Sequence, residues 1–329
     1  MKAIKFFAIT AMAAAMITSC STDDELSQSN YPSDNIIRVT AGVNNAKTRA
    51  DGKGTELKND FSLTIVNKNT EKPELASKYT YVDKVFSKTS GDWACSETLL
   101  WQDDKTPVDI VAFAPAQTGK FNGVYAEGSI KPITYSVADD QSTSSDNNDL
   151  LYYYAKDFNP GTSLVNKKLS IKFNHAFCMI DINVTLGTEF NKPEVLENSP
   201  IVKVTLDGTK IAANVDVTNA ASVVTASGEA ADITTTKGTF DKAANEEANA
   251  KSYFSCIAIP QEVAANTFKV SLMTAGKRYE WTSADPVELK SGYRYTLNLS
   301  MGNDVVLLKG GGITATKWTE ISGGSLETE

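Results

Sequence analysis

Apolar and polar residues alternate with a period of two along most of the chain. Successive side chains of a β-strand point to opposite faces, so this pattern predicts strands that bury one face. The runs are separated by about ten residues rich in Gly, Asn, Asp and Pro, a spacing typical of antiparallel β-sandwiches. The predicted strands lie at 36–43, 61–66, 79–82, 108–113, 170–173, 179–186, 201–206, 253–259, 268–272, 278–281, 293–299 and 305–308. The chain is therefore expected to be an all-β protein.

Turn signals and one short polar segment refine this outline. Asp207-Gly208 and Ala275-Gly276 have the composition of hairpin turns. The best helix candidate, residues 241–250, lacks an apolar stripe and fits a loop equally well. A domain boundary is expected near His175, giving an N-terminal domain of 36–175 and a C-terminal domain of 176–329. The polar loop 187–200 is an alternative boundary.

The first twenty residues predict a lipoprotein signal peptide, residues 1–19. Lys2 and Lys5 precede an apolar stretch at 6–17 that is too short to span a bilayer as a helix. Ile17, two small residues and Cys20 then have the form of a lipobox, with cleavage between Ser19 and Cys20 and acylation of the Cys20 thiol. The alternative is an ordinary signal peptide followed by a cysteine. Residues 20–35 are acidic and rich in Ser and Asn, which predicts a flexible tether.

Charge and residue counts narrow the function classes. The formal net charge of −8 argues against nucleic acid as a partner. His175 is the single histidine, which weakens a His-rich metal site or a His-based triad and favours a hydrogen-bonded structural role. Three cysteines besides Cys20 allow at most one disulfide. Cys178 and Cys256 lie in apolar runs, where buried thiols are favoured over a bridge.

Four features together resemble the fimbrillin family, the subunits of type V pili. They are the lipobox with its acidic tether, and the Thr48-Arg49-Ala50 junction after the first strand. The third is the Asp149–Tyr152 segment followed by Leu169–Ala176, and the fourth is the closing pair Gly292–Leu297 and Ile313–Trp318. Their order and spacing cover almost the whole chain.

The resemblance implies two transthyretin-like, Greek-key β-sandwich domains and a structural pilin without enzyme activity or cofactor. It also implies export as a lipoprotein to the outer membrane and cleavage after Arg49 by an arginine-specific protease. Mature chains would start at Ala50 and polymerise with neighbouring pilin subunits by strand exchange, giving a surface fimbrium that adheres to host surfaces or other bacteria. Cleavage would remove the strand within 36–49 and leave a groove whose apolar side chains and backbone groups accept another strand. On the residue alone, a surface loop arginine is the favoured interpretation of Arg49, and the resemblance is what favours a cleavage site.

The C-terminal segment 313–329 is the expected donor strand. Three glycines at 310–312 precede it and allow the chain to change direction sharply. Ile313, Ala315 and Trp318 are the apolar residues expected to enter a neighbour's groove. The alternative is a final strand that completes its own sheet.

Two rival functions share several of these features. A surface glycan-binding lipoprotein has the same anchor and fold but needs exposed aromatic rings, for which Tyr152, Tyr153 and Tyr154 are the candidates. A hydrolase needs paired carboxylates in a cleft. The acidic loop 139–149 offers oxygen ligands without the spacing of a known calcium loop, so no metal is expected.

Overall fold

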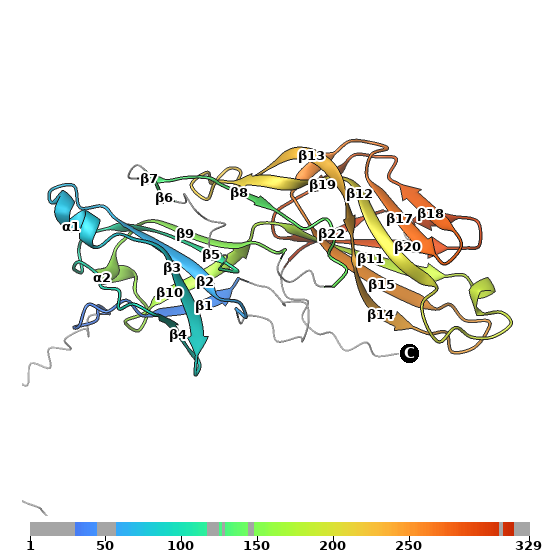
Figure 1. Cartoon of the computed structure of the whole chain (residues 1–329), viewed down its shortest axis with the longest axis horizontal. Helices are drawn as coiled ribbons and strands as arrows, with labels where there is room; N and C mark the ends of the chain where they lie inside the picture. The colour runs from blue at the N-terminus through green and yellow to red at the C-terminus, as the bar shows by residue number, and fades with distance from the viewer. Residues whose placement is uncertain are drawn as a thin grey trace, which may run out of the picture.

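The computed structural model describes residues 30–44, 57–116, 125–126, 129–143, 148–308 and 312–318. In these residues the chain forms an elongated molecule of two lobes, nearly all of it strand (Figure 1). The short exceptions are α1 (Pro73–Lys78), α2 (Pro160–Ser163) and the 3-10 turn η1 (Thr188–Asn191). None of the helices in the described ranges is long and apolar enough to cross a membrane. The all-β prediction is confirmed.

Seven strands of the N-terminal lobe close on themselves in the order β1-β10-β9-β5-β2-β3-β4. Their bounds are β1 (Val39–Val43), β2 (Phe61–Asn67), β3 (Tyr81–Thr89), β4 (Asp92–Cys95), β5 (Val108–Ala114), β9 (Leu151–Phe158) and β10 (Leu169–His175). Neighbours are antiparallel except β1 and β10, which run parallel. Phe61 lies at the centre of the enclosed core, where it contacts the rings of Phe86, Trp93 and Phe173.

The C-terminal lobe is a sandwich of two sheets. One has the order β14-β15-β11-β20-β21, with β22 also paired to β20, and the other has the order β13-β12-β17-β18. The first sheet contains β11 (Cys178–Leu186), β14 (Thr236–Asp241), β15 (Lys251–Ala258), β20 (Tyr293–Met301), β21 (Val306–Leu308) and β22 (Thr314–Lys317). The second contains β12 (Ile201–Val215), β13 (Val224–Thr234), β17 (Lys269–Thr274) and β18 (Arg278–Thr282). Two short ribbons pair β16 (Gln261–Val263) with β19 (Val287–Leu289) and β6 (Tyr125–Ala126) with β7 (Ser129–Ile130).

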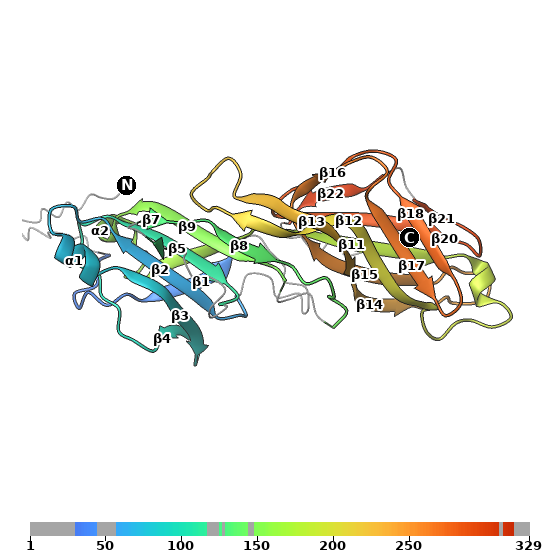
Figure 2. The same cartoon turned by 45° about the horizontal axis from the view of Figure 1, so that its top comes forward.

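One strand from the first half of the sequence joins the second lobe. β8 (Ile133–Ser136) pairs antiparallel with the end of β12, and it runs from one lobe toward the other (Figures 1 and 2). Its buried residues Ile133 and Tyr135 share a core cluster with Val111 and Phe113 of β5 and with most of the C-terminal lobe. The boundary near His175 stays a prediction, and the pairing of β8 crosses it.

Two turn predictions have different outcomes. Ala275-Gly276 lies in the turn between β17 and β18, as predicted. The hairpin predicted at Asp207-Gly208 is wrong, because β12 continues through both residues with a bulge against β13. Gly208 has φ +86°, and a Cβ there would lie 2.1 Å from the carbonyl oxygen of Thr267. The glycine therefore permits a strand irregularity and a close backbone approach.

The remaining local predictions concern residues 241–250 and the cysteines. Beyond the end of β14 at Asp241, residues up to 250 form turns and irregular chain, so the loop alternative holds there. Cys178 and Cys256 are free, buried thiols on the paired strands β11 and β15. Burial raises the pKa of the Cys178 thiol well above its usual range, and its Sγ donates to the carbonyl of Ala258 over 3.3 Å.

Candidate functional site

The predicted site residues fall into two groups. Ser19, Cys20, Arg49 and Ala50 lie outside the described residues, so their predicted roles stay predictions. Ile313, Ala315 and Trp318 lie within them, on and around β22.

The strand predicted to fill the N-terminal groove is β1. Val39 and Val43 are 3% and 2% exposed and point into the core of the N-terminal lobe, together with the buried Ile37. β1 pairs with β10 over its whole length, from Val39 opposite Leu169 to Val43 opposite Phe173. The apolar alternation at 36–43 therefore fills a gap in this lobe with side chains as well as backbone.

The opposite side of β1 is held at few points. Val39 is its one partner position with β4, opposite Trp93. Just before the strand, Ile37 donates to the carbonyl of Leu99 over 2.9 Å, and Trp101 donates to that of Asn35 over 2.8 Å. Loss of β1 would therefore open the ring of strands between β10 and β4.

The ends of β1 are fixed by polar contacts. Before it, Arg38 donates two hydrogen bonds to the carboxylate of Asp34, which lower the pKa of that carboxyl to about 2. After it, the backbone N–H of Asn44 donates to Phe173 over 2.7 Å, and its side-chain amide donates to Asn174 Oδ1 over 3.0 Å. The C-terminal end of β1 is thus hydrogen-bonded to the last residues of β10.

β21 and β22 together form one interrupted edge strand along β20. β21 pairs with 299–301 of β20 and β22 with 293–296, both antiparallel. Only two residues of β20, 297 and 298, separate these pairings, whereas residues 309–313 separate the two short strands. Gly312 has φ +144°, a backbone conformation that favours glycine. The edge pairing along β20 is therefore interrupted between β21 and β22.

β22 itself is an exposed strand with a buried end. The side chains of all four of its residues are exposed, including Ala315, and Ile313 is half-buried. Trp318, which follows the strand, is 7% exposed and belongs to the core cluster of the C-terminal lobe. The backbone N–H of Trp318 donates to the carbonyl of Gly292 over 2.6 Å. The segment thus lies against its own sheet here, and its role as a donor stays a prediction.

Trp318 packs on the single histidine of the chain. Its ring stacks on that of His175 with centroids 3.8 Å apart and planes at 12°. His175 Nδ1 lies 2.7 Å from a carboxylate oxygen of Asp149, in agreement with the predicted hydrogen-bonded role. Asp149 Oδ1, His175 Nε2 and Trp318 Nε1 are buried without a hydrogen-bond partner among the described residues. The sequence showed all three residues but not their contact, because 143 positions separate His175 from Trp318.

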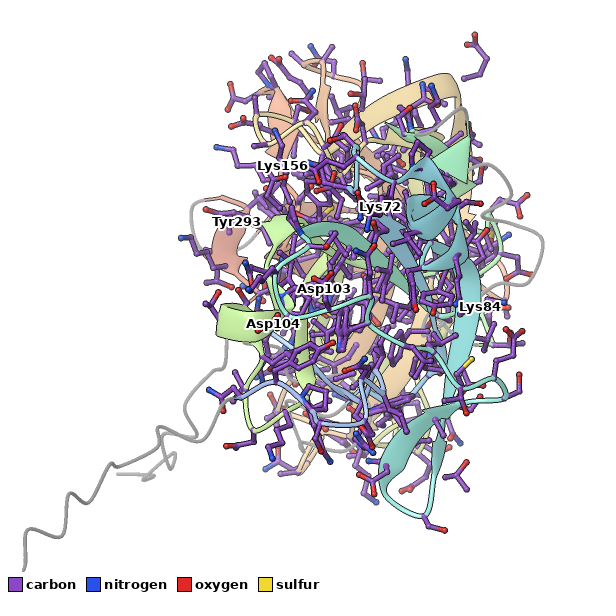
Figure 3. All side chains as sticks on the ribbon, turned by 90° about the vertical axis from the view of Figure 1, so that its left-hand side faces the viewer. Lys72, Lys84, Asp103, Asp104, Lys156 and Tyr293 are labelled. Carbon is purple, nitrogen blue, oxygen red and sulfur yellow. The ribbon has the colours of Figure 1, made fainter. Side chains whose placement is uncertain are left out.

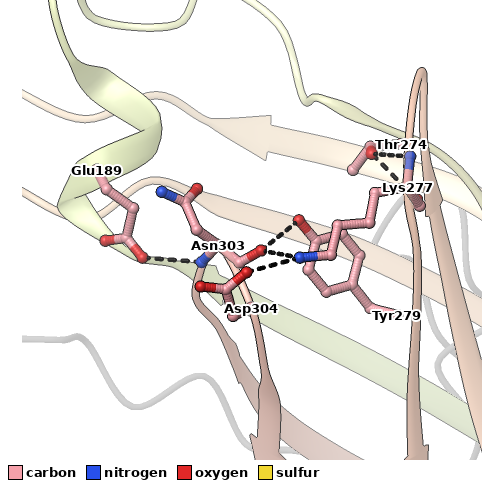
Figure 4. Close-up of polar contacts among 6 residues, drawn as sticks. All are labelled: Glu189, Thr274, Lys277, Tyr279, Asn303 and Asp304. Atoms are coloured by element: carbon pink, nitrogen blue, oxygen red, sulfur yellow. Dashed lines mark hydrogen bonds and ion pairs between the residues drawn. The ribbon is translucent and has the colours of Figure 1, made fainter.

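A polar clamp holds the loop that precedes β21. Lys277 Nζ donates to the carbonyl of Asn303 over 2.5 Å and to Asp304 over 2.9 Å, and the hydroxyl of Tyr279 donates to the same carbonyl (Figure 4). From the other side, Glu189 accepts from the N–H of Asn303 over 3.1 Å. The hydrogen bond to Lys277 lowers the pKa of Asp304. These contacts fix the start of β21 but none of them reaches β22.

The tyrosines considered for glycan stacking are half-buried in the structure. Tyr152 and Tyr154 pack against the core cluster of the C-terminal lobe, and Tyr153 packs against that of the N-terminal lobe. Burial raises the pKa of all three hydroxyls.

The end of the N-terminal lobe carries charges of both signs, with Lys72, Lys84 and Lys156 spread around Asp103 and Asp104 (Figure 3). The acidic loop 139–149 is described except for 144–147.

The fold and the placement of the two end strands define a two-lobed, all-β protein. The model of the fimbrillin-like family matches residues 48–318, so the chain belongs to that family. Among curated proteins, none matches the sequence at a significant level.

Solved structures show the same fold at low sequence identity. A candidate cell adhesion protein from Bacteroides ovatus superposes with a TM-score of 0.58 at 15% identity, covering 84% of this chain and 96% of its own. One from Bacteroides uniformis gives 0.55 at 14% identity, covering 88% of this chain and 100% of its own. A fimbrial protein from Bacteroides vulgatus gives 0.52 at 17% identity, covering 79% and 93%.

Proposed function

We propose that this protein is a structural subunit of a type V fimbria that polymerises by strand exchange. In this account it is exported as a lipoprotein acylated on Cys20, reaches the outer membrane and is cut after Arg49. The cut releases the lipid-bearing strand and opens the groove to a neighbouring subunit. The observation that carries the proposal is the position of β1, which places Val39 and Val43 in the core of the N-terminal lobe beside the preceding Ile37 and ends at Val43, six residues before Arg49.

The acceptor side follows from the pairing of β1. Without β1, the edge of β10 from Leu169 to Phe173 presents unpaired backbone groups beside an apolar groove. Such an edge binds an added strand through main-chain hydrogen bonds and alternate side-chain pockets. A replacement strand with apolar residues two positions apart fits the sites of Val39 and Ala41.

The donor side follows from the interrupted edge strand. Ile313 and Ala315 have that two-residue spacing, and they follow β21, which ends at Leu308. The clamp of Lys277 and Glu189 on Asn303 retains β21 in its own sheet. The segment that leaves is therefore β22 with Trp318, and the chain re-aims at Gly310–Gly312. Having both a removable β1 and a C-terminal donor favours a stalk subunit.

A polymerisation assay on the purified, unlipidated full chain tests this function. After treatment with an arginine-specific protease, the wild-type chain is expected to form a ladder of oligomers in a gel run without heating. Arg49→Ala is expected to stay monomeric, because β1 still fills the groove. Lys47→Ala, a basic residue of the same segment, is the matched control and should polymerise. An Arg49→Ala chain that polymerises as readily as the wild type would rule the proposal out.

A further inference from the structure

Neighbouring residues of β10 contact the N-terminal strand β1 and the C-terminal segment 313–318. Asn44, at the end of β1, is bonded to Phe173 and Asn174. Trp318, at the end of β22, is stacked on His175, the next residue of the same strand. The residue of β10 that contacts the C-terminal segment thus directly follows the residues that contact the end of β1.

The contacts around His175 show how a change on one side reaches the other. His175 and Asn174 pair with Leu151 and Tyr152 of β9, and Asp149 approaches the imidazole from the chain that leads into β9. With β1 present, residues 169–173 of β10 are paired with β1, whereas the pairing of β10 with β9 lies at 174 and 175. Without β1, the same strand becomes a sheet edge, and the ends of edge strands fray at low free-energy cost. His175 would then be held less rigidly, and the Trp318 ring that stacks on it would be held less firmly as well.

From this arrangement we infer that β10 couples the two chain ends, so that docking of β1 and docking of Trp318 stabilise each other. The inference rests on the proposed function for its biological meaning, because cleavage after Arg49 is what removes β1. In the uncut precursor β1 fills the groove of the N-terminal lobe, and the donor segment 313–318 stays bound to its own subunit. Loss of β1 opens the groove and at the same time weakens the packing of Trp318 on His175. One cleavage thereby prepares a subunit both to accept a strand from a neighbour and to donate its own.

Linkage makes this coupling reciprocal, which gives two independent tests. Hydrogen exchange followed by mass spectrometry on the unlipidated full chain reports both ends as peptides covering 37–44 and 313–318. Trp318→Ala is expected to speed exchange in 37–44 by about fivefold or more, the lower end of the range for coupled sites. In the reverse test, cleavage of the wild-type chain after Arg49 is expected to speed exchange in 313–318 by a similar factor.

Two controls separate coupling from general destabilisation. Thr316→Ala changes an exposed residue of β22 whose hydroxyl donates a 3.4 Å bond to Arg294, and it should leave 37–44 unchanged. A peptide covering β2, residues 61–67, should exchange at the wild-type rate in every variant. If Trp318→Ala does not yield folded protein, the cleavage test on the wild-type chain still decides the matter.

Faster exchange confined to 313–318 in Trp318→Ala, with 37–44 unchanged, would overturn the coupling. So would cleavage after Arg49 that leaves 313–318 at its original rate. The polymerisation assay, run on the same samples, distinguishes this failure from failure of the proposed function. Cut chains that polymerise without coupling refute the inference alone, whereas coupled chains that never polymerise refute the function.

Discussion

The indole of Trp318 lies on the imidazole of His175, with ring centroids 3.8 Å apart and an interplanar angle of 12°. This contact joins the last described residue of the chain to the last residue of β10, the strand that carries β1. Within residues 313–318, Trp318 supplies the one buried side chain, since the side chains of β22 are exposed and that strand is held by its backbone pairing with β20. Such an attachment suits a segment that binds its own subunit before assembly and leaves it when the subunit polymerises.

Two matched truncations measure how much of the segment its own subunit uses. A chain ending at Gly312 lacks Trp318 and is expected to lose about 3 kcal/mol of unfolding free energy, the usual cost of removing a buried tryptophan side chain. A chain ending at Trp318 keeps the stack and should unfold close to the wild type. Chemical denaturation of both chains provides the measurement. Equal stability of the two truncated chains would contradict the anchoring role of Trp318.

Trp318→Phe isolates the stacked ring from the indole N–H. A phenyl ring retains a face for His175, and it removes the buried Nε1 that lacks a hydrogen-bond partner among the described residues. An unsatisfied buried donor costs about 1–3 kcal/mol, which offsets much of the loss of ring area. We therefore expect Trp318→Phe to unfold within about 1 kcal/mol of the wild type. A loss as large as that of Trp318→Ala would show that the indole N–H has a partner.

Asp207→Asn gives a pH-dependent stability with a defined sign. Asp207 is buried on β12, its carboxylate accepts from Ser271 over 2.9 Å, and burial raises its pKa. A carboxyl with a raised pKa in the folded state binds its proton more tightly there than in the unfolded chain. The stability that it contributes is therefore present at low pH and is lost as the pH rises through the folded pKa.

Asparagine cannot ionise, so the stability of Asp207→Asn relative to the wild type should rise across the titration range of carboxyl groups and then level off. Thermal melts from pH 3 to pH 8 check this expectation. Asp304→Asn is the control of opposite sign, because the pKa of Asp304 is lowered by its hydrogen bond to Lys277. A flat difference for Asp207→Asn would show that Arg278, whose guanidinium lies 3.8 Å away, already compensates the buried charge.

Local patterns predicted the strands well, and contacts distant in sequence account for what they missed. The run 293–299 corresponds to β20, whose side chains alternate between buried and half-buried, and the run 61–66 corresponds to β2, which is buried on both faces. Asp207-Gly208 has the composition of a turn, but the approach of Thr267 to Gly208 decided its conformation. The pairing of β8 with β12 and the stack of Trp318 on His175 join positions far apart in sequence, and a local pattern contains no information about such partners.

Lipidation is predicted to depend on one residue. Cys20→Ala removes the thiol that takes up the lipid, so the protein should carry no acyl chains and should be retained at the inner membrane or released. Metabolic labelling with a fatty-acid analogue measures this directly. Cys95→Ala, which changes a free cysteine far from the predicted lipobox in sequence, should label like the wild type. Undiminished label on Cys20→Ala would refute the lipobox assignment.

In the proposed assembly, polymerised subunits have lost β1 by cleavage after Arg49. Mass spectrometry of the N-terminal peptide from purified surface filaments tests it most directly. We expect Ala50 as the first residue, with residues 20–49 missing from the assembled material. Filaments built from intact chains that begin at Cys20 would contradict it, because β1 would still fill the groove that a neighbouring strand must enter.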